Sequence, residues 1–201
     1  MNTTLVFAEL LIIGLEGGIW LSLLLFSLFG LKDFDGFLSI IRDWQLVILA
    51  IVLPLLYVIG IILDRITDRL FQRQETKIEQ ETLGDFPVTV PVMRFSLGTE
   101  NDFLNQQLEY TRTRMRVVRA SSVNFVLIAI SISIFLLTRL TNLSSNLRWT
   151  YTALILCIGL LFSYAAFSTW KSLTKGHLKL SKAMYEYQNQ KDRKKKTLKK
   201  S

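Results

Sequence analysis

Four long apolar runs constrain this chain more than any other feature. They are Leu5–Phe29, Trp44–Leu63, Val123–Thr138 and Trp149–Trp170. A bilayer core about 30 Å thick needs about 20 helical residues to cross it, and three of the runs reach that length, while Ala120–Ser122 extend the remaining one. Since backbone polar groups find no partner in lipid, such runs should be helices. The sequence predicts an all-α, polytopic membrane protein with four transmembrane helices.

The composition agrees with a chain that has two kinds of surroundings. Half of the 201 residues are hydrophobic, yet the formal net charge is +8. A soluble domain seldom combines these properties, whereas here the charged residues lie almost entirely outside the four runs. The single cysteine, Cys157, excludes an intrachain disulfide and a thiolate metal site.

The distribution of Lys and Arg predicts the orientation. These residues gather in the second connection, 64–119, and in the tail that follows Trp170. Because basic connections stay in the cytoplasm, both termini should be cytoplasmic. We expect the bacterial inner membrane.

Helical spacing continues past three of the four runs, which predicts a small cytosolic helical bundle. We expect a division into residues 1–63 (two spans and a short outer loop), 64–119 (a cytosolic stalk hairpin), 120–170 (two spans) and 171–201 (a basic helix, then a disordered Lys-rich tail from Asn189). Pro87 and Pro91 interrupt the hairpin within a loop at 83–97. The alternating valines of this loop indicate an extended segment.

Two acids lie on one face of the first run. Glu9 and Glu16 are seven residues apart, and Glu16 is expected near the middle of its span. Ionisable groups inside a span usually face a bundle or a wet cavity. We expect Ser131, Ser133 and Ser163 to bond to Glu16, and Asn124, Arg119 or Arg65 to bond to Glu9. The acids either hold helices together, which we favour, or line an ion or proton pathway.

Small residues and a proline mark two further positions. Gly14, Gly17 and Gly18 favour a close contact between helices. Pro54 lies within the second run and predicts a kink that could act as a hinge.

Two surfaces are candidates for binding. The first, for a soluble cytosolic protein, consists of Val88, Val90, Val92, Arg112, Arg116 and Arg119. The second is basic and faces anionic lipid, with Lys171, Lys175, Lys179 and Lys182 on one helical face. Nucleic acid is an unlikely partner, because no aromatic residues alternate with the basic ones.

Enzyme motifs are absent from the sequence. The one histidine, His177, has no metal-binding or catalytic-triad context, and no glycine-rich phosphate loop is present. We expect no catalytic residue, no metal and no cofactor.

The architecture resembles that of small membrane components of bacterial stress and anti-phage defence systems. This resemblance implies a non-enzymatic, oligomeric membrane protein that couples a cytosolic partner or signal to the membrane, as an anchor, a sensor or a membrane-perturbing effector. The alternative is an ion channel or proton-coupled transporter subunit that uses Glu9 and Glu16.

Overall fold

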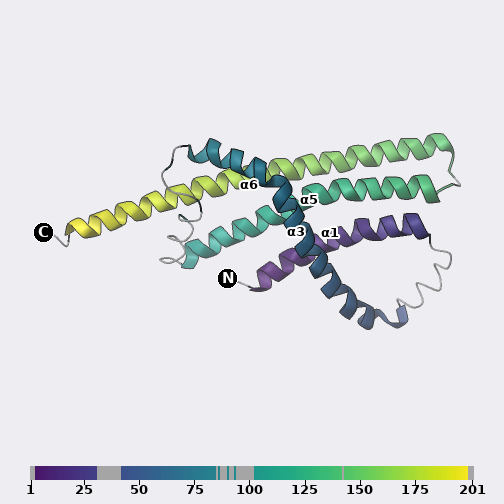
Figure 1. Cartoon of the computed structure of the whole chain (residues 1–201), viewed down its shortest axis with the longest axis horizontal. Coiled ribbons are helices and arrows are strands. Elements are labelled where there is room, and N and C mark those ends of the chain that lie inside the picture. Colours follow the sequence, from purple (N-terminus) through teal and green to yellow (C-terminus); the bar gives the residue numbers. More distant parts are fainter. Residues whose placement is uncertain are drawn as a thin grey trace. The chain divides into compact units, whose positions relative to one another are not determined.

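Four long helices account for most of the residues that the structure describes. The computed structural model describes residues 3–30, 42–84, 86, 90, 93, 102–141 and 143–198. The helices are α1 (Thr3–Phe29), α3 (Gln45–Leu83), α5 (Asp102–Arg139) and α6 (Ser145–Leu198) (Figure 1). Each contains a stretch long and apolar enough to cross a membrane, and the described residues form no strand. The prediction of an all-α chain with four such helices is confirmed.

The chain divides into two compact units. We call Asn2–Leu70 with Arg116–Ser168 the apolar unit, and Phe71–Met115 with Thr169–Ser201 the polar unit. Helices α3, α5 and α6 each contribute residues to both units without a break. The extension of three helices beyond their apolar runs, expected from the sequence, is therefore present.

Glycines end two of the helices. Gly30 follows α1 with φ +72°, and its N–H donates to the carbonyl of Phe26 at 3.1 Å. Gly84 follows α3 with φ +55°, and its N–H donates to the carbonyl of Gln80 at 3.0 Å. Glycine has no Cβ to oppose the left-handed conformation, so it is the usual residue at such helix ends.

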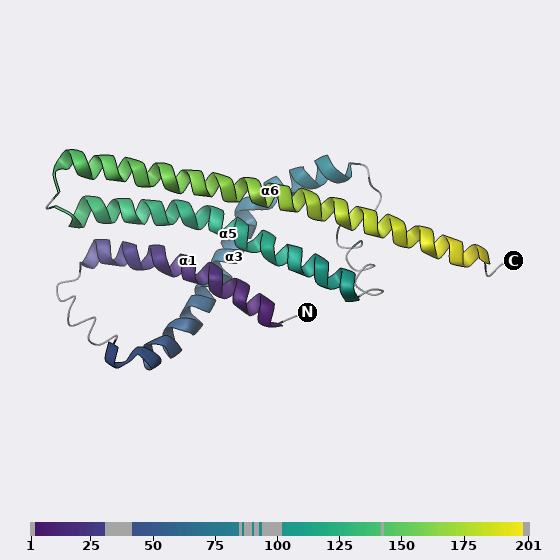
Figure 2. The same cartoon turned by 180° about the vertical axis from the view of Figure 1, so that it is seen from behind.

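Within the apolar unit, α1, α5 and α6 lie side by side in both cartoon views, and α3 crosses α1 (Figures 1 and 2). Helix α5 occupies the middle of the layer. Its buried face carries small and polar residues, namely Ala120, Ser121, Ser122, Asn124, Ala129, Ser131 and Ser133. Small residues allow close approach: a Cβ added at Gly159 of α6 would overlap that of Ala129. Ser163 of α6 also donates to the carbonyl of Ser122 at 2.6 Å.

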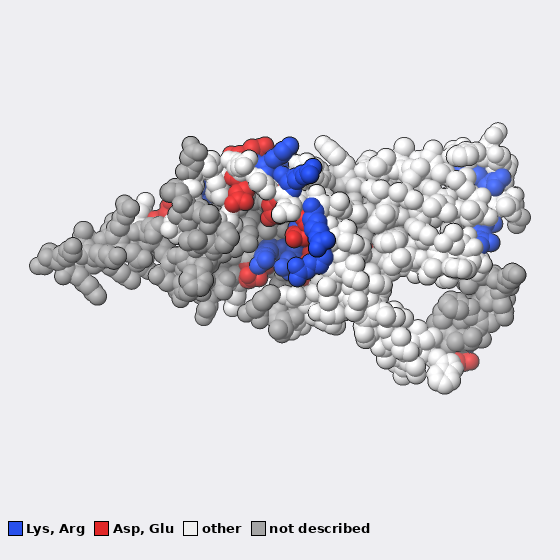
Figure 3. Space-filling model, in the orientation of Figure 1, with Lys and Arg blue, Asp and Glu red and all other residues white. Residues whose placement is uncertain are grey.

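The outer surface of the apolar unit is largely apolar. The face shown in Figure 3 has a broad uncharged area, with charged side chains gathered towards its ends. The first half of α3 is typical, because its large hydrophobic side chains are exposed: Leu46, Val47, Leu49, Ile51, Leu55 and Val58. Exposed apolar area of this extent suits lipid far better than water.

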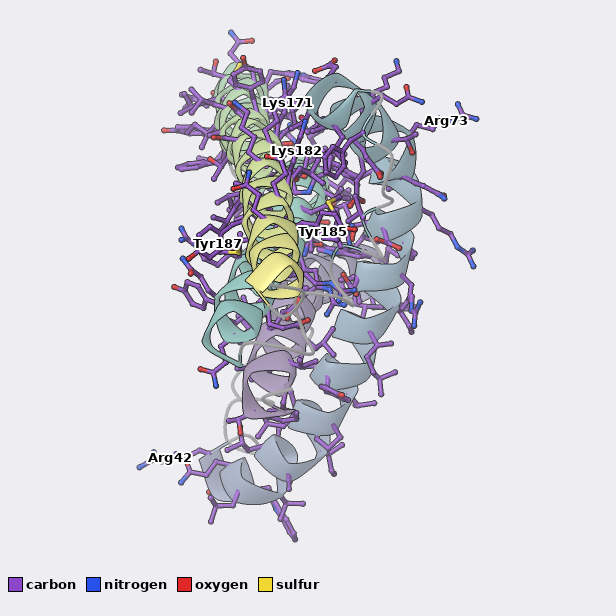
Figure 4. The ribbon with its side chains drawn as sticks, turned by 90° about the vertical axis from the view of Figure 1, so that its left-hand side faces the viewer. Arg42, Arg73, Lys171, Lys182, Tyr185 and Tyr187 are labelled. Carbon is purple, nitrogen blue, oxygen red and sulfur yellow. The ribbon has the colours of Figure 1, made fainter. Side chains whose placement is uncertain are left out.

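The polar unit has a core of its own. Its buried apolar residues are Ile78, Leu83, Val90, Met93, Leu108, Met115, Trp170 and Leu178. Phe71 packs edge-on against Trp170, with ring centroids 4.9 Å apart. Figure 4 shows Tyr185 and Tyr187 on opposite sides of α6, and Tyr185 contacts the ring of Phe86.

Polar contacts join α6 to the rest of this unit. Lys175 donates to Glu81 at 3.0 Å, and Lys182 lies 4.8 Å from the centre of the Phe86 ring. The hydrogen bond from Lys175, together with its positive charge, lowers the pKa of the Glu81 carboxyl. Glu81 lies well beyond the apolar run that ends at Leu63.

Three local features differ from the sequence-based expectations. Trp170 ends the fourth apolar run, yet it is only 2% exposed and belongs to the core, unlike the exposed Trp149 at the start of that run. Val90 and Met93 are helical and buried, three residues apart, which is helical and not strand spacing. Helix α6 continues to Leu198, because Lys, Gln and Arg are good helix formers even without apolar neighbours.

Candidate functional site

Three polar contacts set α1 against α5. Near the start of α1, the carboxylate of Glu9 lies 3.5 Å from Nη1 of Arg116. About two turns farther on, Glu16 bonds to α5 at two side chains. At the far end, Arg139 donates to the carbonyls of Ser27 and Leu28 at 3.0 and 2.9 Å. The two helices are therefore parallel and in a fixed register.

Glu16 is the centre of a hydrogen-bonded cluster. Ser121 donates to Oε1 of Glu16 at 2.7 Å, and Nδ2 of Asn124 donates to Oε2 at 2.9 Å. The side-chain oxygen of Asn124 in turn accepts from the indole N–H of Trp20 at 3.3 Å. Asn124 is buried, while Glu16 and Trp20 are partly buried. Both carboxylate oxygens of Glu16 thus bond to side chains of a neighbouring helix.

The expected partners of Glu16 were wrong in register. Ser133 donates to the carbonyl of Ala129 within its own helix, and Ser163 donates to Ser122. Ser131 is buried, and its hydroxyl makes no hydrogen bond to the described residues. The register differs because α5 is helical well before its apolar run begins. Its residues 116–124 therefore lie level with the first half of α1.

Glu9 is buried beside Arg116, and not beside Asn124, Arg119 or Arg65 as expected. The side chain of Arg116 is only about a quarter exposed in this contact. A buried carboxylate needs a positive or hydrogen-bonding neighbour, because desolvation alone strongly disfavours its charge. Arg116 supplies that neighbour from within the same chain.

Arg119 joins α5 to α3. Its guanidinium donates to Asp68 at 2.6 Å and to Asp64 at 3.1 Å, and its side chain is only 7% exposed. The two aspartates are one helical turn apart and so reach the same guanidinium. The ion pair with Asp64 is largely buried, whereas the side chain of Asp68 is 58% exposed. A buried pair is strongly damaged by loss of one partner, unlike an exposed one.

Arg119 and Arg139 mark the two ends of an uncharged stretch in α5. They are twenty residues apart, about 30 Å along a helix, which matches the thickness of a bilayer core. Glu16 lies level with Ser121 and Asn124, close to the Arg119 end. It therefore lies nearer to one end of the α5 stretch than to its middle.

The glycines of α1 contact α3 of the same chain. A Cβ added at Gly14 would overlap the backbone carbonyl of Leu56, and one added at Gly60 would overlap that of Leu10. Gly17 faces Leu63 and Ile59. The predicted close contact at Gly14, Gly17 and Gly18 is present, with an intrachain partner. Gly60 was missed, although it is the only glycine in a run of large aliphatic residues.

The remaining residues of the predicted partner surface and the predicted hinge do not come together in one site. Arg112 pairs with Glu109 of its own helix at 3.8 Å, and both are partly exposed. Val90 is 6% exposed and so is not a free docking residue, whereas Val88 and Val92 lie outside the described residues. Helix α3 is continuous through the exposed Pro54, where a hinge stays a prediction.

The four lysines on the basic face of α6 differ in their surroundings. Lys175 and Lys182 contact Glu81 and Phe86, as described above, whereas Lys171 and Lys179 are exposed. Among the described residues no group of three or more His, Cys, Asp or Glu side chains is placed to hold a metal ion.

A scan against protein-family models finds no match, and searches of curated proteins and of solved structures find no similar protein.

Proposed function

We propose that this chain is a non-enzymatic, multi-pass membrane protein that couples a soluble cytosolic partner to the membrane. The observation that carries the proposal is the continuity of α3, α5 and α6. Each runs from the apolar unit into the polar unit as one unbroken helix. A helix resists bending, so a force or displacement applied to its polar part is passed to its apolar part.

The polar contacts at the ends of the apolar unit support this role. Helix α3 leaves that unit at Leu70, and α5 enters it at Arg116. Arg116 forms an ion pair with Glu9 of α1, and Arg119, about one turn later, donates hydrogen bonds to Asp64 and Asp68 of α3. A displacement of α5 would therefore reach both neighbouring helices through these two arginines.

The alternative, a channel or proton-coupled transporter, has less support. A pathway group must exchange its ion or proton, yet Glu16 is held by Ser121 and Asn124, and Glu9 by Arg116. These contacts favour a role in helix packing. Homo-oligomerisation remains part of the proposal, but the glycine face of α1 no longer argues for it, because α3 covers that face.

Site-specific photo-crosslinking in cells of the native host tests the proposal. A crosslinking amino acid at Tyr110, which is exposed in the polar unit, should give one discrete adduct with a soluble protein. The same group at the exposed Trp149 of the apolar unit is the control and should give none. No adduct at Tyr110, together with steady ion flux through liposomes that contain the purified chain, would instead favour the channel.

A further inference from the structure

Helix α3 has two contrasting faces just beyond its apolar run. On the inner face Leu63 and Thr67 are buried, and Asp64 and Asp68 bond to Arg119. The outer face carries Arg65, Ile66, Arg69 and Leu70, all exposed. We call these four residues the α3 patch. They all belong to the apolar unit.

The arginines of the α3 patch have no acidic partner among the described residues. Asp68 follows Arg65 by three residues, a spacing that permits an ion pair on a helix, but its carboxylate is engaged by Arg119. Among the ion pairs formed by the described residues, none includes Arg65 or Arg69. The outer face therefore keeps two positive charges without a counter-charge.

An apolar ridge runs beside the basic one. Ile66 is 48% exposed and Leu70 is 61% exposed, and they are one helical turn apart, as are Arg65 and Arg69. Two large aliphatic side chains next to two unneutralised guanidinium groups suit a boundary between lipid and water. The aliphatic side chains then enter the acyl region, and the long arginine side chains reach the headgroups.

We infer that the α3 patch binds the phosphate of an anionic phospholipid headgroup, with Ile66 and Leu70 against its acyl chains. Guanidinium groups bind phosphate oxygens as a planar fork. Two arginines one turn apart have their Cβ atoms about 5–6 Å from each other, close enough to share one phosphate. This inference rests on the proposed function, because it requires that the apolar unit lies in a membrane.

Lipid fits this surface better than an acidic soluble protein does. The patch continues directly from the apolar run that ends at Leu63, with no intervening polar surface on the outer face. The first residue of the patch, Arg65, follows Asp64, which bonds to Arg119 at the end of the uncharged stretch of α5. A soluble partner would have to dock against the edge of the bilayer to reach it.

Native mass spectrometry of the full chain in dodecyl maltoside micelles tests the inference. Palmitoyl-oleoyl phosphatidylglycerol is the anionic probe, and palmitoyl-oleoyl phosphatidylcholine is the zwitterionic control. The wild type should retain the anionic lipid at least about tenfold better. Arg65→Gln/Arg69→Gln should abolish that preference, and Arg65→Lys/Arg69→Lys should lose part of it because the fork is missing while the charge remains.

A matched charge control separates a site from general attraction. Lys171→Gln/Lys179→Gln removes two exposed charges from α6 and should weaken retention by no more than about threefold. Equal losses in the lysine and arginine variants would overturn the inference, as would a wild type that retains both lipids alike. Neither result touches the coupling function, whose failure shows in the crosslinking experiment. Both double variants should unfold at the wild-type temperature, since the substituted side chains are exposed.

Discussion

Helix α1 packs against its two neighbours by different physical means. Against α3 the contact is made by backbone, with Gly14 on the carbonyl of Leu56 and Gly60 on that of Leu10. Against α5 the contact is made by polar side chains, through Glu9, Glu16 and Arg139. In lipid neither contact gains from a hydrophobic effect, so close packing and hydrogen bonds are the means available. The first contact tolerates no added atom, whereas the second tolerates any side chain that keeps its hydrogen bonds.

The largest effect is expected at the glycine contact. Gly60→Ala places a methyl group on a backbone carbonyl and should destabilise the purified protein by about 2 kcal/mol. The matched control is Gly18→Ala, whose methyl meets only the end of the Leu56 side chain, at 2.6 Å. That side chain can rotate away, so the change should be below about 0.5 kcal/mol. Unfolding by SDS titration measures both, and equal losses would contradict the backbone contact.

The next effect is expected at the hydrogen-bonded contact. Asn124→Ala removes a donor to Glu16 and an acceptor from Trp20, and should cost about 1–2 kcal/mol. Ser133→Ala is the control, because that hydroxyl bonds only within its own helix. A double-mutant cycle of Asn124→Ala with Glu16→Ala should show a coupling of about 1 kcal/mol. A coupling near zero would mean that this pair does not hold α1 against α5.

A smaller effect is expected from Glu16→Gln. The new amide can donate to the Ser121 hydroxyl and accept from Asn124, so both hydrogen bonds persist. Stability should change by less than about 0.5 kcal/mol. Ion flux through liposomes should equal that of the wild type. A flux that the wild type shows and this variant lacks would favour the pathway role of Glu16.

The smallest effect is expected for a polar contact in water. Glu81 and Lys175 form an exposed pair in the polar unit. The pKa of Glu81 is lowered from its ordinary value of 4.5, so the contribution of the pair is present above that value and disappears as the pH falls through the lowered pKa. Glu81→Gln should therefore lower the unfolding midpoint slightly at pH 7, with no difference at pH 2. A difference that grows towards low pH would contradict this sign.

The fold was predictable because three of the four apolar runs reach the length of a bilayer-spanning helix, and Ala120–Ser122 extend the remaining one. The contact glycines were predictable in type, since Gly14 and Gly17 stand on one helix among leucines and isoleucines. Their partner was not predictable, because Gly60 offers the same signal as any isolated glycine in a span. A single sequence does not distinguish a glycine that faces another copy from one that faces its own chain.

The type of polar contact between the helices was predictable, but the predicted register of the helices was wrong. Glu16 required hydrogen-bond donors, and α5 offered several serines, but which serine lies level with Glu16 depends on how far each helix extends beyond its run. Arg116 and Arg119 looked like exposed surface because they precede the apolar run. Arg116 and Arg119 are shielded from solvent because α1 and α3 pack beside α5. That packing could not be inferred from the sequence at those positions. Polar residues next to a span are therefore poor guides to a partner surface.

The central claim is that lipid surrounds the apolar unit, and Cys157 tests it directly. This single cysteine is exposed on α6, eight residues or about 12 Å from Trp149. Only a thiolate in contact with water reacts rapidly with a maleimide. In intact vesicles a sulfonated, membrane-impermeant maleimide should leave Cys157 unlabelled, and labelling should become complete once SDS dissolves the bilayer. Complete labelling before SDS is added would show water around the apolar unit and contradict the account.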